Sequence, residues 1–460
     1  MAARLAISSV SKPRRGQGLA AAAADISPGP LVVALALPLL FLHARFQPTL
    51  TFSLGSTRPQ AMLSDFAVLA VAAAALVTGI RRGFAPLRAG WWIWAAGAFF
   101  LIWIGISIVS GSSRFDSYPA GTHFVTAVKW DEYALLALSL PLLLRRVRDL
   151  ELVLAALGIW SLAATVVGVL EFFGADVAST GTFGRRQASF LGSSDFAALS
   201  GAALLAGVVV LVLPGARLDR RLGRLLVGSG ALGSIIAGSL SALLGLATAL
   251  VLFGVVLFVR APATRRRLAV VAAVLGVVGV ASLAIRSADL NAFSRFLGGK
   301  QADTSNPNKV QTYAHRTLLA YIGVRIWEDH PLLGVGWEGS NDPYAYMPYV
   351  PDAKKRYPDE SPLAFPTPTR SYGVQNVYLQ ALADMGIVGL VAWLAPFAAA
   401  LALGLRSARR EAGAIACLWL VFVLWCWTAQ GFVAGIPLDA LTWLAVGLAA
   451  TAAAWRRTGA

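Results

Sequence analysis

The sequence predicts an all-α integral membrane protein with about twelve transmembrane helices and one large extracytoplasmic loop. Its 460 residues are 57% hydrophobic and only 13% charged, which lies outside the range of soluble globular proteins. Apolar runs of roughly 20 residues, long enough to cross the hydrocarbon layer, recur along the chain. These runs must be helical, because lipid offers no hydrogen-bond partners to a polypeptide backbone.

The apolar runs define the predicted spans. The seventh and eighth belong to one continuous run that is too long for a single span, and we expect the turn between them at Gly238 and Ser239. The predicted spans are 30–46, 61–80, 90–111, 128–145, 150–173, 188–214, 225–237, 240–259, 267–286, 374–404, 412–432 and 437–455.

Most of the basic residues lie in short loops on one side of these spans. The loops read "RRGFAPLR" (81–88), "RRVRD" (145–149), "GARLDRRLGR" (215–224), "RAPATRRR" (260–267) and "RSARR" (406–410), and both tails are basic too. Because arginine and lysine favour the cytoplasmic side, both termini are predicted to be cytoplasmic. The net charge of +16 is spread over these helix ends, so we expect no nucleic-acid partner.

This orientation divides the chain into three parts. Residues 1–286 hold the first nine spans, residues 287–373 form one extracytoplasmic loop, and residues 374–460 hold the last three spans. A loop of this length is uncommon and usually functional. Its second half contains many prolines, which predicts an irregular lid.

The loop also contains an amphipathic pattern. We expect a helix over 313–327 at the outer membrane surface, with its apolar face against the bundle or lipid. The apolar residues at helical spacing are Leu318, Leu319, Ile322 and Ile326. Pro331 and the glycines of "DHPLLGVG" end the helix.

No cofactor or metal is predicted. Cys417 and Cys426 both fall in the eleventh span and form no metal-ligand or disulfide framework. The segment "GVGWEG" (334–339) has neither the strand before it nor the helix after it that a nucleotide-binding loop requires, so it is a turn.

Three segments on the extracytoplasmic side carry recognisable motifs. They read "GTFGRRQASFLGSSDF" (181–196), "HRTLLAYIGVRIWEDHPLLGVG" (315–336) and "SYGVQNVYLQALADMGIVGL" (371–390). Together they resemble the O-antigen ligase and O-antigen polymerase family of bacterial polysaccharide assembly. That family has an arginine that opens a helix ending in "PL-GVG", and then a "His-Asn-x-Tyr-Leu-Gln" signature with an acidic residue before a glycine.

The resemblance implies an activity. Family members look like metal-independent glycosyltransferases of the GT-C class in the bacterial inner membrane, with the active site on the extracytoplasmic face. They transfer a glycan from an undecaprenyl diphosphate carrier to the hydroxyl of a glycan or lipid acceptor, with inversion. The acceptor is lipid A core in a ligase, another carrier-linked unit in a polymerase, or a protein in an oligosaccharyltransferase.

A multi-pass transporter or flippase is the alternative from another functional class. Few charged residues fall deep within the spans, and no pair of spans is broken by glycine or proline in the manner of a transporter repeat. Both observations favour the glycosyltransferase.

Arginines at the extracytoplasmic ends of spans are the candidate diphosphate ligands. Arginine binds phosphate through two parallel hydrogen bonds and stays charged, so it can stabilise a leaving diphosphate. We expect Arg186 and Arg316 to do so, with Arg185 as an alternative to its neighbour and with Arg325 and Arg370 as further ligands. The competing interpretation is that these side chains only extend to the membrane interface.

The general base is harder to assign from the sequence. Gln375 stands where the family signature has histidine, and it is followed by Asn376 as in the family. Glutamine accepts no proton at useful pH, so Gln375 and Asn376 are expected to bind or orient substrate. His315, next to Arg316, is the substitute base that we predict. Asp384 occupies the acidic position of the signature, where either packing or catalysis would explain it.

Overall fold

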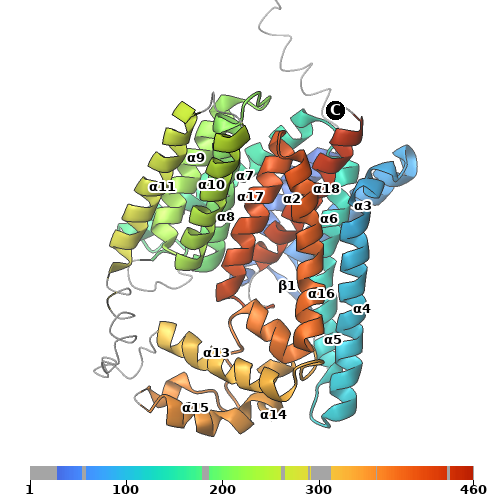
Figure 1. The fold of residues 1–460 in the computed structure, drawn as a ribbon, viewed down its shortest axis with the longest axis vertical. Coiled ribbons are helices and arrows are strands. Elements are labelled where there is room, and N and C mark those ends of the chain that lie inside the picture. Colours follow the sequence, from blue (N-terminus) through green and yellow to red (C-terminus); the bar gives the residue numbers. More distant parts are fainter. Residues whose placement is uncertain are drawn as a thin grey trace, which may run out of the picture.

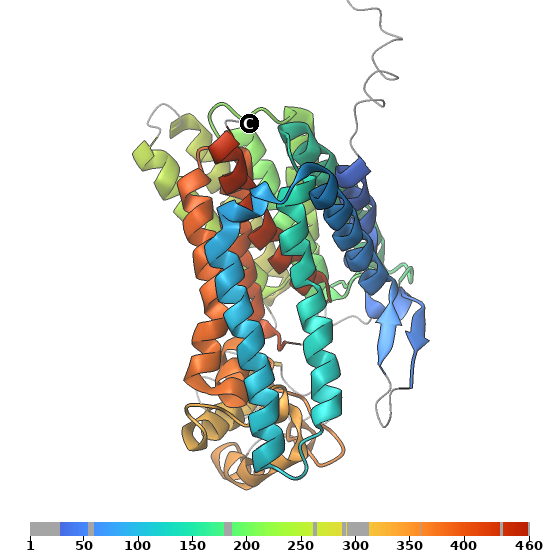
Figure 2. The same cartoon turned by 90° about the vertical axis from the view of Figure 1, so that its right-hand side faces the viewer.

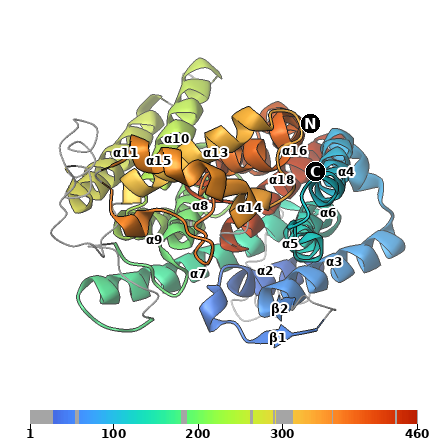
Figure 3. The same cartoon turned by 90° about the horizontal axis from the view of Figure 1, so that it is seen from below.

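The computed structural model describes residues 28–53, 59–178, 186–260, 265–287, 291, 312–358, 360–432 and 436–458. The chain forms a helical bundle with a layer of shorter helices across one end (Figures 1 and 3). The bundle helices are α2 (Pro28–Leu40), α3 (Leu63–Arg82), α4 (Trp91–Arg114), α5 (Ala120–Glu132), α6 (Ala134–Leu143), α7 (Val147–Phe172), α8 (Ser193–Val212), α9 (Arg220–Ala237), α10 (Leu240–Arg260), α11 (Arg265–Ile285), α16 (Val377–Ser407), α17 (Glu411–Cys426) and α18 (Ile436–Thr458).

A short antiparallel hairpin follows α2. It pairs β1 (Thr49–Thr51) with β2 (Gln60–Met62), and β2 leads directly into α3.

Nine helices within the described ranges are long and apolar enough to cross a membrane, so the chain is a multi-pass membrane protein. The other three predicted spans also coincide with helices, but these are weaker. α2 has 13 residues, the fourth span is divided between α5 and α6 at Tyr133, and α9 begins with several arginines. The number twelve therefore stays a prediction. The expected turn at Gly238 is confirmed, since α9 ends at Ala237 and Gly238 adopts φ 55° as its left-handed cap.

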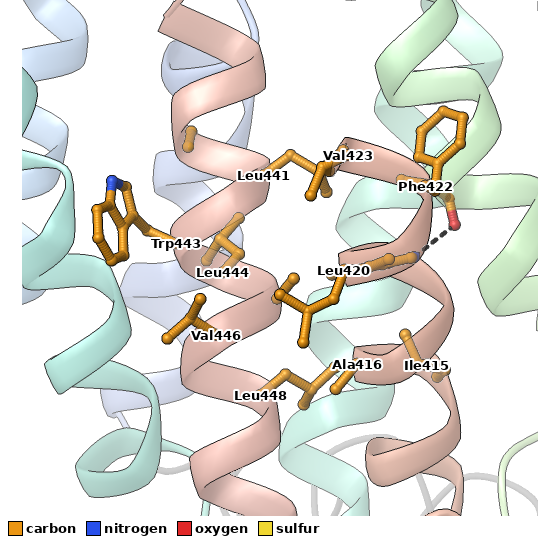
Figure 4. Packing of buried hydrophobic residues seen from close by; sticks show 14 of the residues in the cluster. Ile415, Ala416, Leu420, Phe422, Val423, Leu441, Trp443, Leu444, Val446 and Leu448 are labelled. Carbon is orange, nitrogen blue, oxygen red and sulfur yellow. Dashed lines mark hydrogen bonds between the residues drawn. The ribbon is translucent and has the colours of Figure 1, made fainter. Parts of the chain in front are cut away.

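The core of the bundle is built around α8 and α18. In the most apolar stretch of each of these two helices, 94% of the residues are buried. The corresponding fractions are 22% for α4 and 17% for α11, which lie at the edge of the bundle. Figure 4 shows how α17 and α18 interdigitate, with Leu420 and Val423 of α17 facing Leu441 and Leu444 of α18. A helix that is apolar all round is stable only when other helices or lipid surround it.

The layer across the end of the bundle comprises residues 312–358 and 360–376, which we call the loop layer. It contains α13 (Thr312–Asp329), α14 (Pro343–Tyr346), α15 (Val350–Arg356) and three 3-10 turns (Gly339–Asn341, Met347–Tyr349 and Pro362–Ala364). α4 and α5 reach down to it (Figure 2), while the C-terminus lies at the opposite end (Figure 1). The predicted irregular lid is therefore wrong, because the second half of the loop folds into short helices.

The loop layer has its own hydrophobic core. The predicted helix is present, and its apolar face is buried as expected, with Leu318 and Ile326 fully buried. This face packs mainly against the layer itself and not against lipid. Its partners include Ala345, Tyr346, Val350, Ala353, Ala364 and Phe365, together with Ala383 of α16.

A break in α16 holds the loop layer on the bundle. Gly386 has φ 68° and ψ −171°, a conformation essentially restricted to glycine, and it interrupts the helix. The segment after α13 fills the break: the N–H of Val335 donates to the Ala383 carbonyl (2.9 Å), and the N–H of Ile387 donates to the Pro331 carbonyl (2.9 Å). A Cβ on Gly334 would lie 2.2 Å from the carbonyl carbon of Asp384. The glycines of "GVG" and "DMG" therefore permit close contact between these two segments.

Candidate active site

Three of the predicted site residues meet in the loop layer. His315 and Arg316 lie in the first turns of α13, and a tight turn in which Thr367 and Arg370 exchange backbone hydrogen bonds brings Arg370 back towards them. The Arg370 guanidinium lies 5.4 Å from the centre of the Tyr372 ring, and the His315 ring meets the same tyrosine edge-on at 4.5 Å. One tyrosine therefore contacts both a cation and an imidazole.

The surroundings of His315 suit a base. Burial lowers the pKa of His315 below its usual value, and the nearby charges of Arg316 and Arg370 lower it too, while a hydrogen bond with the Ala364 backbone opposes them. The imidazole is therefore neutral at pH 7. Its Nε2 atom is buried and has no hydrogen-bond partner in the part of the chain that the structure describes. A neutral ring with an unused nitrogen can accept a proton.

Gln375 lies close to this group of residues. It adopts φ 45°, which is unusual for a residue with a side chain, and its Nε2 donates to the Tyr372 carbonyl (3.4 Å). Tyr372 thus contacts both Gln375 and His315. His315 therefore lies beside the segment where the family signature has its histidine.

The other polar residues of the signature hold helices together. Asn376 caps α16, where its Oδ1 accepts from the N–H groups of Tyr378 and Leu379 (both 3.1 Å), and its Nδ2 donates to the Thr428 carbonyl (3.1 Å). The Tyr378 hydroxyl donates to the Leu424 carbonyl (2.6 Å). These contacts give Asn376 a structural role, and its predicted contact with substrate stays a prediction.

Arg186 lies with a second arginine at the turn between α9 and α10. The Arg186 Nε donates to the Ala237 carbonyl (3.2 Å), and Nη1 of the buried Arg286 donates to the Gly238 carbonyl (2.7 Å). Two guanidinium groups therefore meet at the C-terminal end of one helix. Arg185 lies outside the described residues.

Sequence reasoning missed Arg286. It is the last residue of the predicted ninth span, and its position suggested only the end of an apolar run. The available signal was a single arginine at one end of a span whose other basic residues lie at the opposite end.

Arg325 is placed differently. Its guanidinium forms an ion pair with Glu328 one turn later on α13, and its side chain is 40% exposed. Arg370 and His315 both contact Tyr372, whereas Arg325 is paired with Glu328. The expected role of Arg325 in binding stays a prediction.

A buried acidic network lies beside the break in α16. Glu338, at φ 59°, accepts hydrogen bonds from Gln380 Nε2 (2.9 Å) and from Asn341, and Asp384 Oδ1 accepts from the N–H of Ser340 (2.7 Å). Burial, together with the charge of Asp384, raises the pKa of Glu338 to about 8. The network therefore connects the loop layer to α16 through a carboxyl that is protonated at neutral pH.

Asp342 makes a second polar connection from the loop layer to the bundle. Its carboxylate lies 2.7 Å from His123 Nε2 on α5. Within the described ranges, no three His, Cys, Asp or Glu side chains cluster as metal ligands, and independence from metal stays a prediction.

A comparison with protein families matches part of the chain to a family model. Residues 225–394 match the family model described as O-antigen ligase. The matched segment runs from α9 to the middle of α16, so it includes Arg286, His315, Arg316, Arg370 and Gln375 but not Arg186. A search of curated proteins found no match.

Proposed function

Because its segment 225–394 places the chain in the O-antigen ligase and O-antigen polymerase family, we propose that it transfers a glycan from undecaprenyl diphosphate to an acceptor hydroxyl. The family consists of enzymes that act on lipid-linked glycans, and the chain is a multi-pass membrane protein. The proposed site lies in the loop layer, on the extracytoplasmic face of the inner membrane.

The observation that carries the proposal is the position of His315. Its buried Nε2 lacks a partner among the described residues, and it lies beside Arg316 and close to Arg370. A base next to fixed cations is the arrangement that transfer from a diphosphate requires. The base activates the incoming hydroxyl, and the cations stabilise the charge that leaves.

In the proposed reaction, Nε2 of His315 takes the proton of the acceptor hydroxyl. The hydroxyl oxygen attacks the anomeric carbon from the side opposite the diphosphate, and a new glycosidic bond forms with inversion. The bond from the anomeric carbon to the phosphate oxygen breaks at the same time, and its electron pair leaves with undecaprenyl diphosphate. Arg316 and Arg370 stabilise the added charge on that group.

Arg186 and Arg286 are proposed as a second pair of phosphate ligands. Both guanidinium groups are fixed by backbone carbonyls at the α9–α10 turn. Guanidinium groups bind phosphate oxygens through two parallel N–H groups. This pair would hold the carrier's diphosphate while the glycan extends towards α13.

The acceptor remains a choice between a ligase and a polymerase reaction. Gln375 in place of the family's histidine favours a polymerase or a divergent ligase. A protein acceptor would make the enzyme an oligosaccharyltransferase.

Reconstitution of the purified protein in vesicles tests the proposal. The assay supplies a carrier-linked glycan, one candidate acceptor at a time and a chelator in place of metal. A new glycosidic product together with free undecaprenyl diphosphate is expected. Movement of the carrier lipid without formation of a bond would instead support a flippase. A strict requirement for divalent metal would contradict stabilisation of the leaving group by arginine.

A further inference from the structure

A cavity opens between helices at the end of the bundle opposite the loop layer. Its volume is about 320 Å³, and it lies between α2, the last turns of α3 and the end of α6. Its walls are mostly apolar and include Val32, Ala74, Val77, Leu142 and Leu143. The C-terminus lies at the same end of the molecule (Figure 1), which is predicted to be cytoplasmic.

Three arginines line this cavity, and none of them has an acidic partner in the part of the chain that the structure describes. Arg81 and Arg82 end α3, and Arg145 follows α6. The carboxylate of Asp149 accepts from the backbone N–H groups of Arg145 and Arg146 and so caps α7. The cavity therefore combines apolar walls with an excess of positive charge.

The guanidinium of Arg145 is partly held and partly unused. Its Nε donates to the Leu142 carbonyl (3.2 Å), whereas its Nη2 is buried without a hydrogen-bond partner among the described residues. Burial lowers the pKa of Arg145, and the like charge of Arg82 lowers it further, while the charge of Asp149 opposes them. Two neighbouring cations with an unsatisfied donor are stabilised when an anion lies between them.

We propose that this cavity binds an anionic phospholipid of the cytoplasmic leaflet. The lipid phosphate lies between Arg82 and Arg145, with Arg81 at the rim, and an acyl chain follows the apolar walls between α2 and α3. Free phosphate would leave those walls exposed to water, so the tails distinguish a lipid from a soluble anion. Basic pockets between helices at the cytoplasmic surface suit such headgroups.

The competing explanation is that these arginines only orient the protein in the membrane. Orientation depends on the number of charges near the helix ends and not on their place in a cavity. Arg88 and Arg457 provide a matched control, because both are exposed arginines at the same end of the bundle and neither lines the cavity.

Binding is measured on the delipidated full-length protein in detergent, by native mass spectrometry and by thermal unfolding. Phosphatidylglycerol should bind and raise the unfolding temperature, and phosphatidylcholine should not. At about 1 kcal/mol for each arginine, Arg82→Gln combined with Arg145→Gln should weaken binding by about thirtyfold. The pair Arg88→Gln and Arg457→Gln should bind as the wild type does.

Two further measurements test the apolar part of the site. Ala74→Phe keeps every charge but fills the cavity, and it should also weaken binding. Glycerol 3-phosphate, which has the headgroup phosphate but no tails, should not compete. Equal binding by the wild type and the Arg82/Arg145 double variant would overturn the proposal, as would equal losses in the control pair. Full competition by glycerol 3-phosphate would assign the site to soluble anions.

Discussion

Replacing Gly386 with alanine tests how the loop layer is held on α16. The backbone at Gly386, with φ 68° and ψ −171°, costs a residue with a side chain roughly 1–3 kcal/mol. The new Cβ would lie 2.1 Å from the Leu332 carbonyl oxygen, so the loop backbone must move away. That movement weakens the hydrogen bonds from Ile387 to Pro331 and from Gly336 to Asp384, each worth about 1 kcal/mol. We expect a total destabilisation of about 4 kcal/mol.

The assay is denaturant unfolding in detergent, together with limited proteolysis of the loop layer. Gly105→Ala in α4 is the matched control, because no atom lies within 4 Å of its new Cβ and alanine favours the helix. The control should be neutral or slightly stabilising. Equal stability of Gly386→Ala and Gly105→Ala would refute the role assigned to the break in α16.

Three further predictions concern protonation and topology. The pKa of Glu338 is raised to about 8, so the wild type loses stability as pH rises from the usual carboxyl value towards 8. Glu338→Gln should remove this loss, so its gain in stability over the wild type should be larger at about pH 9 than at about pH 5.5; an equal effect at both pH values would contradict the assignment. Transfer activity should fall at low pH with a midpoint below the usual pKa of histidine, because the pKa of His315 is lowered. Arg370→Gln removes one of the charges that lower this pKa, so it should move the midpoint to higher pH. A midpoint that does not move would exclude His315 as the base. A cysteine at the exposed Lys355 should react with an impermeant reagent in intact cells, and one at Arg88 should be protected; the reverse pattern would invert the topology.

The sequence predicts the helices of the bundle well because lipid surrounds them. Apolar runs determine helices directly when the backbone has no other partners, and each predicted span coincides with a helix. The loop layer was predicted less well. Pro348 and Pro351 belong to the proline-rich stretch that predicts an irregular lid, yet each lies at the start of a short 3-10 or α-helix, where proline is favourable.

Some features of the candidate site follow from the sequence, and others do not. The proximity of His315 and Arg316 follows directly from the sequence, because the two residues are adjacent on one helix. Their roles in catalysis stay predictions. The contact between Glu338 and Gln380, 42 residues apart, depends on the break in α16 and leaves no periodic signal in the sequence. Asn376 shows a limit of motif reasoning, since the motif gave no sign that this residue caps α16. Its expected contact with substrate stays a prediction.

The most direct measurement is glycan transfer by Arg316→Ala in reconstituted vesicles, compared with wild type at matched protein level. Loss of a cation that stabilises the leaving diphosphate should reduce the rate by at least about a hundredfold, and Arg316→Lys should restore little of it because an ammonium lacks the bidentate geometry. Arg356→Ala, at an exposed arginine of the loop layer for which no role in binding is proposed, is the control and should retain most of the activity. Transfer by Arg316→Ala at the wild-type rate would contradict the proposed mechanism.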